Sequence, residues 1–297
     1  MRGPSPRRHA RDRRTSSARP VVTLGPAVAP AVAPAVAPAV ALAVALVAGC
    51  MSDGPPLAPG SRPGQPLPDE ERLRLRAALS DAMAERQEVR RYGDAWSVLA
   101  EGAEVAPGAI RLFYTRRIVP AANRASGRNQ SEADFWNREH VWPQSYGLKG
   151  NPARTDLHNL VPVDRTVNSA RGNKAFDEAN TPHHECRGCR VSGRAWEPDP
   201  DVQGDVARIA FYMDVRYEGA PTDGVPDLVL DDTTSSTQAR FGELSTLARW
   251  HCRDPVSAEE RQRHDVVANA QGNRNVFVDT PVLAGEVFGF ACGTADR

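Results

Sequence analysis

Chemically reactive side chains are concentrated in residues 135–176, FWNREHVWPQSYGLKGNPARTDLHNLVPVDRTVNSARGNKAF. An adjacent Glu-His pair, Glu139 and His140, lies near the start of this stretch. Further candidates follow it and include a second histidine, two carboxylates and three amides: His158, Asp156, Asp164, Asn159, Asn168 and Asn173. Such a concentration is typical of a site that carries out chemistry.

The chemistry of these groups suits the hydrolysis of phosphodiesters. A free histidine has a pKa of about 6.5, so near neutral pH His140 is mostly unprotonated and can take a proton from water. Glu139 and the asparagine carbonyls are hard oxygen ligands of the kind that Mg²⁺ and Ca²⁺ prefer. A base makes the nucleophile, and an oxygen-bound cation stabilises the charge that develops on the phosphate and the leaving oxygen.

The pattern around these residues predicts a strand, a loop, a second strand and a short helix. If residues 155–163 form a strand, alternation places Asp156 and His158 on one face. Asp164 is then a natural N-cap for a helix over residues 165–171, which Gly172 stops. Asn168 lies one turn into that helix.

The stretch resembles the bacterial endonuclease I family, periplasmic and secreted nucleases that carry a ββα-metal (His-Me) finger. The resemblance covers roughly residues 68–280. Its motifs occur in consistent order: LFYTRR (112–117), NREHVWPQS (137–145), DLHNLVP (156–162), VNSARGN (167–173), GDVARIAFYMDVRY (204–217), WHCRDPVS (250–257) and QGNRN (271–275).

The resemblance implies roles for individual residues. His140 would be the general base, and Glu139 and Asn168 would hold one Mg²⁺, with Ca²⁺ or Mn²⁺ as alternatives. It also implies 5′-phosphate and 3′-hydroxyl products, with DNA and possibly RNA as the substrate. Some relatives carry a longer insertion between the first two site motifs, with an arginine that contacts the cleaved phosphate. Only fifteen residues separate those motifs here, and the candidates for that role are Arg138, Arg154 and Arg171.

Three further polar residues fit supporting roles better than catalytic ones. Asp156 and His158 are expected mainly to hold the site residues in place, because side chains next to a metal site often position its ligands. Asn173 could either cap the end of the helix or orient site residues.

The N-terminal region predicts export. Residues 1–20 hold seven arginines and one aspartate, and an apolar run over residues 39–49 follows. This run is too short to span a bilayer but suits a signal peptide. It ends in Val-Ala-Gly-Cys, which resembles a bacterial lipobox, so residues 1–50 are interpreted as a lipoprotein-type signal with Cys50 as the lipidated residue. Ordinary secretion with an incidental cysteine is the alternative.

Beyond the signal, residues 51–67 are rich in proline and glycine and are expected to be a tether. Residues 68–297 are predicted to form a single α+β domain, mostly helical, with a small antiparallel sheet and the ββα-metal finger. The location would then be the outer membrane, the periplasm, the cell surface or the medium, and we expect a monomer. The remaining elements predicted are helices over 68–91, 94–100, 203–217, 241–250 and 257–268, the last with a Ser257–Glu260 capping box, a strand over 109–118 and an exposed loop over 219–239.

Charge is distributed unevenly. The chain is neutral overall, but residues 1–50 carry seven cations and one anion, so the remainder has a net charge of −6. Residues 106–175 nevertheless hold eleven Lys and Arg against five Asp and Glu. Five arginines in this segment could line a phosphate-binding groove, although for any one of them a solvated loop is the simpler interpretation: Arg111, Arg116, Arg117, Arg124 and Arg128.

Cysteine usage leaves three interpretations open. The segment HHECRGCR (183–190) could supply zinc ligands. Export instead favours two disulfides among Cys186, Cys189, Cys252 and Cys292. The CxxC pair could also belong to a thiol-disulfide oxidoreductase, but no thioredoxin-like βαβ pattern surrounds it.

The sequence therefore predicts an endonuclease with little sequence preference. A catalytically inactive, nucleic-acid-binding surface lipoprotein is the rival hypothesis. The intact Glu139, His140 and Asn168 argue against this rival, and cleavage in the presence of Mg²⁺ would discriminate between the two.

Overall fold

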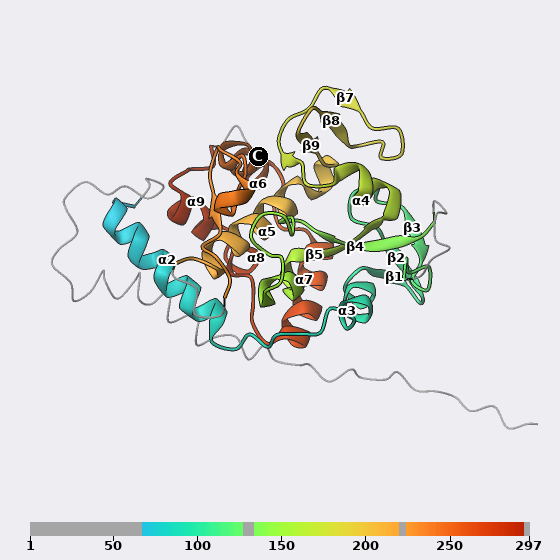
Figure 1. The fold of residues 1–297 in the computed structure, drawn as a ribbon, viewed down its shortest axis with the longest axis horizontal. Helices are drawn as coiled ribbons and strands as arrows, with labels where there is room; N and C mark the ends of the chain where they lie inside the picture. Colours follow the sequence, from blue (N-terminus) through green and yellow to red (C-terminus); the bar gives the residue numbers. More distant parts are fainter. Residues whose placement is uncertain (1–66, 127–133, 220–223, 294–297) are drawn as a thin grey trace, which may run out of the picture. The chain divides into compact units, whose positions relative to one another are not determined.

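A computed structural model describes residues 67–126, 134–219 and 224–293, and these form one α+β domain (Figure 1). The predictions for residues 1–66, Cys50 included, and for Arg128 lie outside the described residues. The longer helices of the domain are α2 (Asp69–Ala84), α3 (Ala95–Gly102), α5 (Gln203–Arg216), α6 (Leu244–Arg253) and α7 (Ala258–Gln271). Its shorter helices are α4 (Arg165–Arg171), α8 (Val276–Asp279) and α9 (Val282–Phe288). In the described part of the chain, no helix has both the length and the apolar character needed to cross a membrane.

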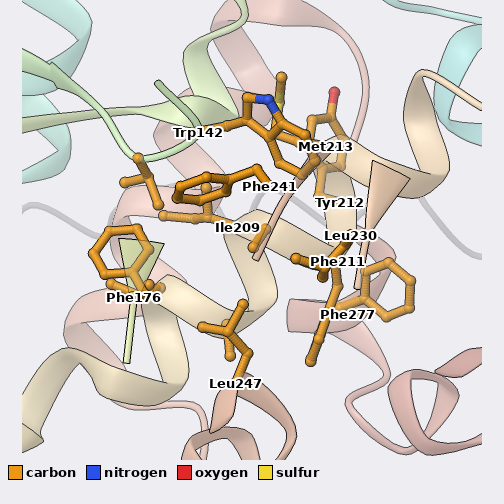
Figure 2. Close-up of a cluster of buried hydrophobic side chains, with 14 of the residues drawn as sticks. Trp142, Phe176, Ile209, Phe211, Tyr212, Met213, Leu230, Phe241, Leu247 and Phe277 are labelled. Atoms are coloured by element: carbon orange, nitrogen blue, oxygen red, sulfur yellow. The ribbon is translucent and has the colours of Figure 1, made fainter. Parts of the chain in front are cut away.

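The core is built around α5. All of its residues except Arg216 are buried, because apolar side chains recur every three to four positions and neighbouring helices cover the polar ones. Figure 2 shows Ile209, Phe211 and Met213 of α5 among aromatic side chains from distant segments, including Trp142 and Phe241. The helix is thus confirmed almost to the residue.

The strands form several small sheets in place of one. These are β1 (Glu104–Ala106), β2 (Ala109–Arg111) and β3 (Ile118–Pro120); β4 (Trp136–His140) with β5 (Leu160–Asp164); β6 (Ala175–Phe176), β9 (Ala195–Glu197), β8 (Arg190–Ser192) and β7 (Thr181–Pro182); and β10 (Val229–Leu230) with β11 (Arg240–Phe241). The β6–β9 and β10–β11 pairs are parallel. The predicted strand over 109–118 is confirmed over 109–111 and wrong beyond, since the chain turns back after Arg111, where Leu112 N–H donates to the carbonyl of Arg117 at 2.8 Å.

The antiparallel β4–β5 hairpin and α4 make up the element that carries the site (Figure 1). Its second strand begins only at Leu160. The predicted strand over 155–163 is wrong at its start because residues 152–155 and 157–159 form 3₁₀ turns, and the Asp156 carboxylate accepts a hydrogen bond from the His158 N–H at 3.0 Å. The predicted helix is confirmed as α4, which Gly172 ends at a φ of 61°.

Other boundaries differ for local reasons. Helix α2 ends at Ala84 instead of Arg91, and α6 starts after Phe241, which β11 takes up. The predicted exposed loop over 219–239 contains buried Val225 and Leu228. Ser257 does cap α7, but the Glu260 carboxylate pairs with Arg208 and does not close the capping box.

Both cysteine pairs are disulfides, Cys186–Cys189 and Cys252–Cys292, so the two-disulfide prediction is confirmed. The zinc interpretation is wrong because the thiols that would bind the metal are bonded to each other. Cys186 and Cys189 are completely buried. A redox enzyme must present its disulfide to a substrate thiol, so the oxidoreductase interpretation is wrong as well.

Candidate active site

The β4–β5 hairpin and α4 bring the three predicted central residues together. Glu139 and His140 are the last two residues of β4, and both side chains are buried. They pair with Val161 and Leu160 of β5. Helix α4 follows β5 directly and folds back over β4, so the Asn168 amide Nδ2 donates to the carbonyl oxygen of Arg138 at 3.3 Å. Residues almost thirty positions apart thus meet at one end of the hairpin.

His140 is held in one orientation by two hydrogen bonds. Its Nε2 lies 2.9 Å from the carbonyl oxygen of Arg154, an atom that can only accept, so Nε2 carries the proton. Its Nδ1 therefore has the lone pair, and the Gln144 Nε2 lies 3.3 Å from it as a donor. The Arg154 Nε donates to the other end of the same Gln144 amide at 2.8 Å. The nitrogen able to accept a proton is therefore Nδ1.

Electrostatics keep this imidazole neutral. Burial lowers the pKa of His140 to about 4, against the opposing effect of its hydrogen bond to the Arg154 carbonyl. The nearby positive charges of Arg154, Arg138 and Arg171 contribute to this lowering of the pKa. At neutral pH the ring is thus unprotonated and available as a base.

Glu139 is buried between two donors. The Tyr114 hydroxyl donates to its Oε1 at 3.1 Å and the Arg171 Nη1 donates to the same oxygen at 2.8 Å. Burial raises the pKa of Glu139, while the charge of Arg171 and the Tyr114 hydrogen bond oppose that rise. Among the described residues, the side-chain hydrogen bonds to this carboxylate both end on Oε1.

Arg171 is a structural centre of the site. Its side chain is completely buried, and it also donates to the carbonyls of His140 at 2.8 Å and Val141 at 2.7 Å. Its guanidinium carbon lies 4.4 Å from the centre of the Phe176 ring. A group so enclosed cannot reach a substrate phosphate, which leaves Arg138 and Arg154 from the three candidate arginines.

Arg138 and Arg154 lie against aromatic rings. The guanidinium carbon of Arg138 is 3.6 Å from the centre of the Tyr92 ring and 4.1 Å from that of Trp96, and that of Arg154 is 4.2 Å from Tyr92. The Tyr92 ring also stacks on His140, with 5.7 Å between ring centres. In the part of the chain that is described, neither arginine has a carboxylate within ion-pair distance.

Asp156 and His158 are buried away from His140 Nδ1 in a network of their own. The Asp156 Oδ2 accepts from the hydroxyls of Tyr212 and Tyr217, both at 2.8 Å. The His158 Nε2 bonds to the carbonyl of Asn273 at 3.1 Å. Asn173 is exposed, and its amide donates to the Ser145 hydroxyl at 3.3 Å.

The arginines upstream of the site are engaged with carboxylates. Arg111 and Arg116 both pair with Glu259, and Arg117 pairs with Asp164. A cavity of about 50 Å³ opens beside this group, next to the start of α7, and not beside His140. These ion pairs neutralise much of the charge, so for these three residues the groove prediction is not supported.

Three residues that line the site were not predicted as functional: Tyr92, Tyr114 and Gln144. Tyr114 and Gln144 lie inside the quoted motifs LFYTRR and NREHVWPQS, which was the available signal. Tyr92 lies in the irregular segment between α2 and α3, and nothing in its spacing relates it to His140. Among the described residues, no group of three or more His, Cys, Asp or Glu side chains could hold a metal ion, and the predicted ligand pair has one carboxylate and one amide.

A buried Glu-His pair, a facing amide and unneutralised arginines define the class of site found in enzymes that cleave phosphodiesters. Comparison with known proteins agrees, since the sequence profile described as Endonuclease I matches residues 73–282. Extracellular ribonucleases of Bacillus amyloliquefaciens and Bacillus subtilis (strain 168) are each 42% identical to the chain over 203 residues, covering 66% of this chain and 68% of theirs. An extracellular deoxyribonuclease of Aeromonas hydrophila is 25% identical over 193 residues, covering 60% of this chain and 77% of that protein.

The chain belongs to the endonuclease I family and is an endonuclease that acts on nucleic acid. The relatives are named as ribonucleases and as deoxyribonucleases, so membership fixes the class of reaction. It leaves open which nucleic acid is cleaved.

Proposed function

We propose that this protein is an exported, divalent-metal-dependent endonuclease that cleaves RNA and DNA with little sequence preference, leaving 5′-phosphate and 3′-hydroxyl ends. The observation that carries the proposal is the orientation of His140. Its lone pair is on Nδ1, and Glu139, its neighbour in the chain, lies at the same end of the hairpin as Asn168, whose amide bonds to the Arg138 carbonyl. The proposal assigns the neutral base and the two oxygen ligands to one site.

In the proposed reaction, His140 Nδ1 takes a proton from the attacking water. The ring then carries a positive charge, and its Nε2–H bond to the Arg154 carbonyl strengthens as that charge forms. The Gln144 amide nitrogen lies 3.3 Å from Nδ1 in the resting site, so the attacking water must replace this hydrogen bond before the proton is transferred. Loss of such a base reduces the rate by roughly 10²- to 10⁴-fold.

The donor set fits a hard cation such as Mg²⁺, with Ca²⁺ or Mn²⁺ as alternatives. Tyr114 and Arg171 both bond to Glu139 Oε1, and neither of these side chains takes up Oε2, the oxygen that the proposal assigns to the metal. The Asn168 Nδ2 is used by the Arg138 carbonyl, which directs the carbonyl Oδ1 of this amide away from the backbone. When bound, the cation would stabilise the negative charge on the phosphate and the departing 3′-oxygen.

The substrate is held through its backbone in this proposal. Arg154 is the leading candidate for the contact to the cleaved phosphate because its guanidinium Nε donates to the same Gln144 amide whose nitrogen lies 3.3 Å from His140 Nδ1. Phosphate contacts carry no sequence information, so contacts of this kind give non-specific cleavage. They are also common to RNA and DNA, in line with the names of the relatives.

The proposal places the enzyme outside the cytoplasm. Relatives named as extracellular or periplasmic nucleases support export. The signal over residues 1–50 and lipidation of Cys50 remain proposals. Palmitate labelling of the protein, lost on Cys50→Ser, would support the outer-membrane anchor, and secretion without a lipid would contradict it.

The test is digestion of plasmid DNA and of ribosomal RNA by the purified protein, with Mg²⁺ and with EDTA. We expect digestion to disappear in EDTA and to fall at least 100-fold in His140→Ala. His184→Ala, at an exposed position, is the matched control and should digest like wild type. Undiminished digestion by His140→Ala would remove His140 as the base. Binding of nucleic acid without cleavage by the folded wild type would favour the binding-protein hypothesis.

A further inference from the structure

Two aromatic rings and two guanidinium groups alternate beside His140. The order is Trp96, Arg138, Tyr92 and Arg154, with ring-to-guanidinium distances of 4.1, 3.6 and 4.2 Å. These four residues come from α3, β4, the irregular segment before α3 and the 3₁₀ turn before Asp156. Three separate parts of the chain therefore converge on one stack, since Tyr92 and Trp96 are only four residues apart.

The two arginines must lie on opposite faces of the Tyr92 ring. A guanidinium group in contact with a ring lies about 3.5 Å above its plane, within the distance typical of cation–π pairs. Two such groups on the same face, each this close to the ring centre, would overlap. Tyr92 is therefore a spacer between two positive charges.

This arrangement holds the arginines without neutralising them. Arg111, Arg116 and Arg117 pair with carboxylates, whereas Arg138 and Arg154 have none within ion-pair distance among the described residues. The face of an aromatic ring attracts a cation but carries no net charge. The positive charge thus stays available to a phosphate group.

Tyr92 is connected to His140 by two routes. Its ring stacks on the imidazole, with an angle of 27° between the ring planes. It also fixes Arg154, whose Nε holds Gln144 and whose carbonyl holds the His140 Nε2. A shift of the Arg154 side chain would therefore be felt both at the phosphate contact and at the base.

We propose that Tyr92 is a positioning residue that holds Arg138 and Arg154 in place as unneutralised phosphate-binding groups beside His140. The inference rests on the proposed function. It predicts that the ring matters and the hydroxyl does not, because the Arg138 hydrogen bond to Tyr92 goes to its backbone carbonyl. Arg138 also packs on Trp96 and donates to the backbone carbonyl of Tyr92, and both contacts persist without the Tyr92 ring, so loss of the ring should act largely through Arg154.

The test is a double-mutant cycle measured as kcat/KM on a fluorescent oligonucleotide. Tyr92→Phe should stay within about threefold of wild type, and Tyr92→Leu should lose about 10- to 100-fold, since small misplacements of positioning groups have effects of this size. In an Arg154→Ala background, Tyr92→Leu should cost less than about threefold more, because residues that act together are not additive. Tyr92→Met provides a second ringless variant if Tyr92→Leu does not fold.

A matched control is Phe288→Leu in another part of the domain. It removes a ring whose centre lies 5.3 Å from the guanidinium carbon of Arg76. It should change the melting temperature without changing kcat/KM. A full Tyr92→Leu loss on top of Arg154→Ala would show a general structural role and overturn the inference, as would wild-type activity of Tyr92→Leu. His140→Ala run in the same assay separates the two proposals, because activity in that variant would overturn the proposed function itself.

Discussion

Arginines serve three different purposes near the site. Arg171 is buried and holds Glu139 and two backbone carbonyls in place. Arg138 and Arg154 are held on aromatic rings, and neither has an ion-pair partner among the residues that the structure describes. Arg111 and similar residues pair with carboxylates. The purpose of each follows from its partner, since the guanidinium group is the same in every case.

The first purpose predicts a defect in metal use. Arg171→Met should raise the Mg²⁺ concentration needed for half-maximal activity by about 10- to 100-fold, the usual effect of removing a residue that orients a metal ligand. It removes one of the two donors to Glu139 Oε1 and leaves that carboxylate without its positive partner. Activity measured against Mg²⁺ concentration at a temperature where the variant is folded tests this.

Arg165→Met is the control for that experiment, because Arg165 lies on the same helix but is exposed. Its Mg²⁺ dependence should match wild type. Arg171→Lys keeps a charge but cannot span all three acceptors. Its half-maximal Mg²⁺ concentration should fall between those of wild type and Arg171→Met. Identical Mg²⁺ curves for Arg171→Met and wild type would mean that Arg171 supports only the fold.

Sequence reasoning found the residues that are local and missed those that are not. Glu139, His140 and Asn168 lie in short motifs whose residue types already indicate chemistry, and the structure brings them together. Tyr92 and Tyr114 reach the same place from earlier segments by tertiary packing. No spacing in the sequence encodes that approach, so the motif LFYTRR was the one signal for Tyr114 and there was none for Tyr92.

At the scale of elements, the predicted ends of helices and strands were right where the residue at the boundary plays the expected role and wrong where its side chain bonds elsewhere. Gly172 ends α4 as expected. Asp156, interpreted as a strand residue, instead accepts hydrogen bonds from His158 N–H and from two buried tyrosines, and this forces a turn before β5. A polar residue at an alternating position therefore mimicked a strand.

Helix α7 shows the same competition and yields a prediction. The Glu260 carboxylate forms two hydrogen bonds with Arg208 of α5, at 2.8 and 2.6 Å, and both side chains are completely buried. Breaking this buried pair leaves Arg208 with only its longer, 3.3 Å ion pair to Asp205 among the described carboxylates, so Glu260→Gln should lower the free energy of unfolding by about 3 kcal/mol. Urea unfolding measures the change.

The adjacent Glu259 is a matched control on the same helix. Its side chain is 46% exposed and pairs with Arg111 and Arg116 at the surface, so Glu259→Gln should cost less than about 1 kcal/mol. Equal unfolding midpoints for the two variants would show that the buried pair does not join α5 to α7.

For the whole molecule, the helical framework could be predicted and the small sheets could not. The apolar periodicity of α5 extends over four turns and is unambiguous. Strands of two or three residues, such as β6 and β10, are too short for alternation to be recognised. They form because distant segments meet, as in the parallel pairing of β6 with β9.

The net charge of the chain does not predict the charge at the site, because folding decides which charged side chains are paired. Outside residues 1–50 the chain has a net charge of −6, which taken alone argues against a polyanionic substrate. Within the described part of the chain, folding pairs many of the acidic side chains with arginines and leaves Arg138 and Arg154 without a carboxylate partner. These two residues therefore contribute positive potential beside His140.

The two disulfides should contribute differently to the whole molecule. Cys252–Cys292 joins α6 to the segment after α9 across 40 residues, while Cys186–Cys189 spans three. The longer loop restricts the unfolded chain more, so Cys252→Ser with Cys292→Ser should lower the free energy of unfolding by about 3–4 kcal/mol in the chain-entropy account. No candidate site residue lies on α6 or α9, so activity of the folded variant should stay within about twofold of wild type.

Cys186–Cys189 instead packs on the backbone of Tyr114, with Cys186 Sγ 3.1 Å from its carbonyl oxygen. Replacing Cys186 and Cys189 with serines should therefore lower nuclease activity more than the Cys252→Ser/Cys292→Ser replacement does. It should lower the free energy of unfolding less, because the loop that it opens is short. Denaturant unfolding and nuclease assays on both double variants test the distinction, and an inactive but folded Cys252→Ser/Cys292→Ser protein would refute it.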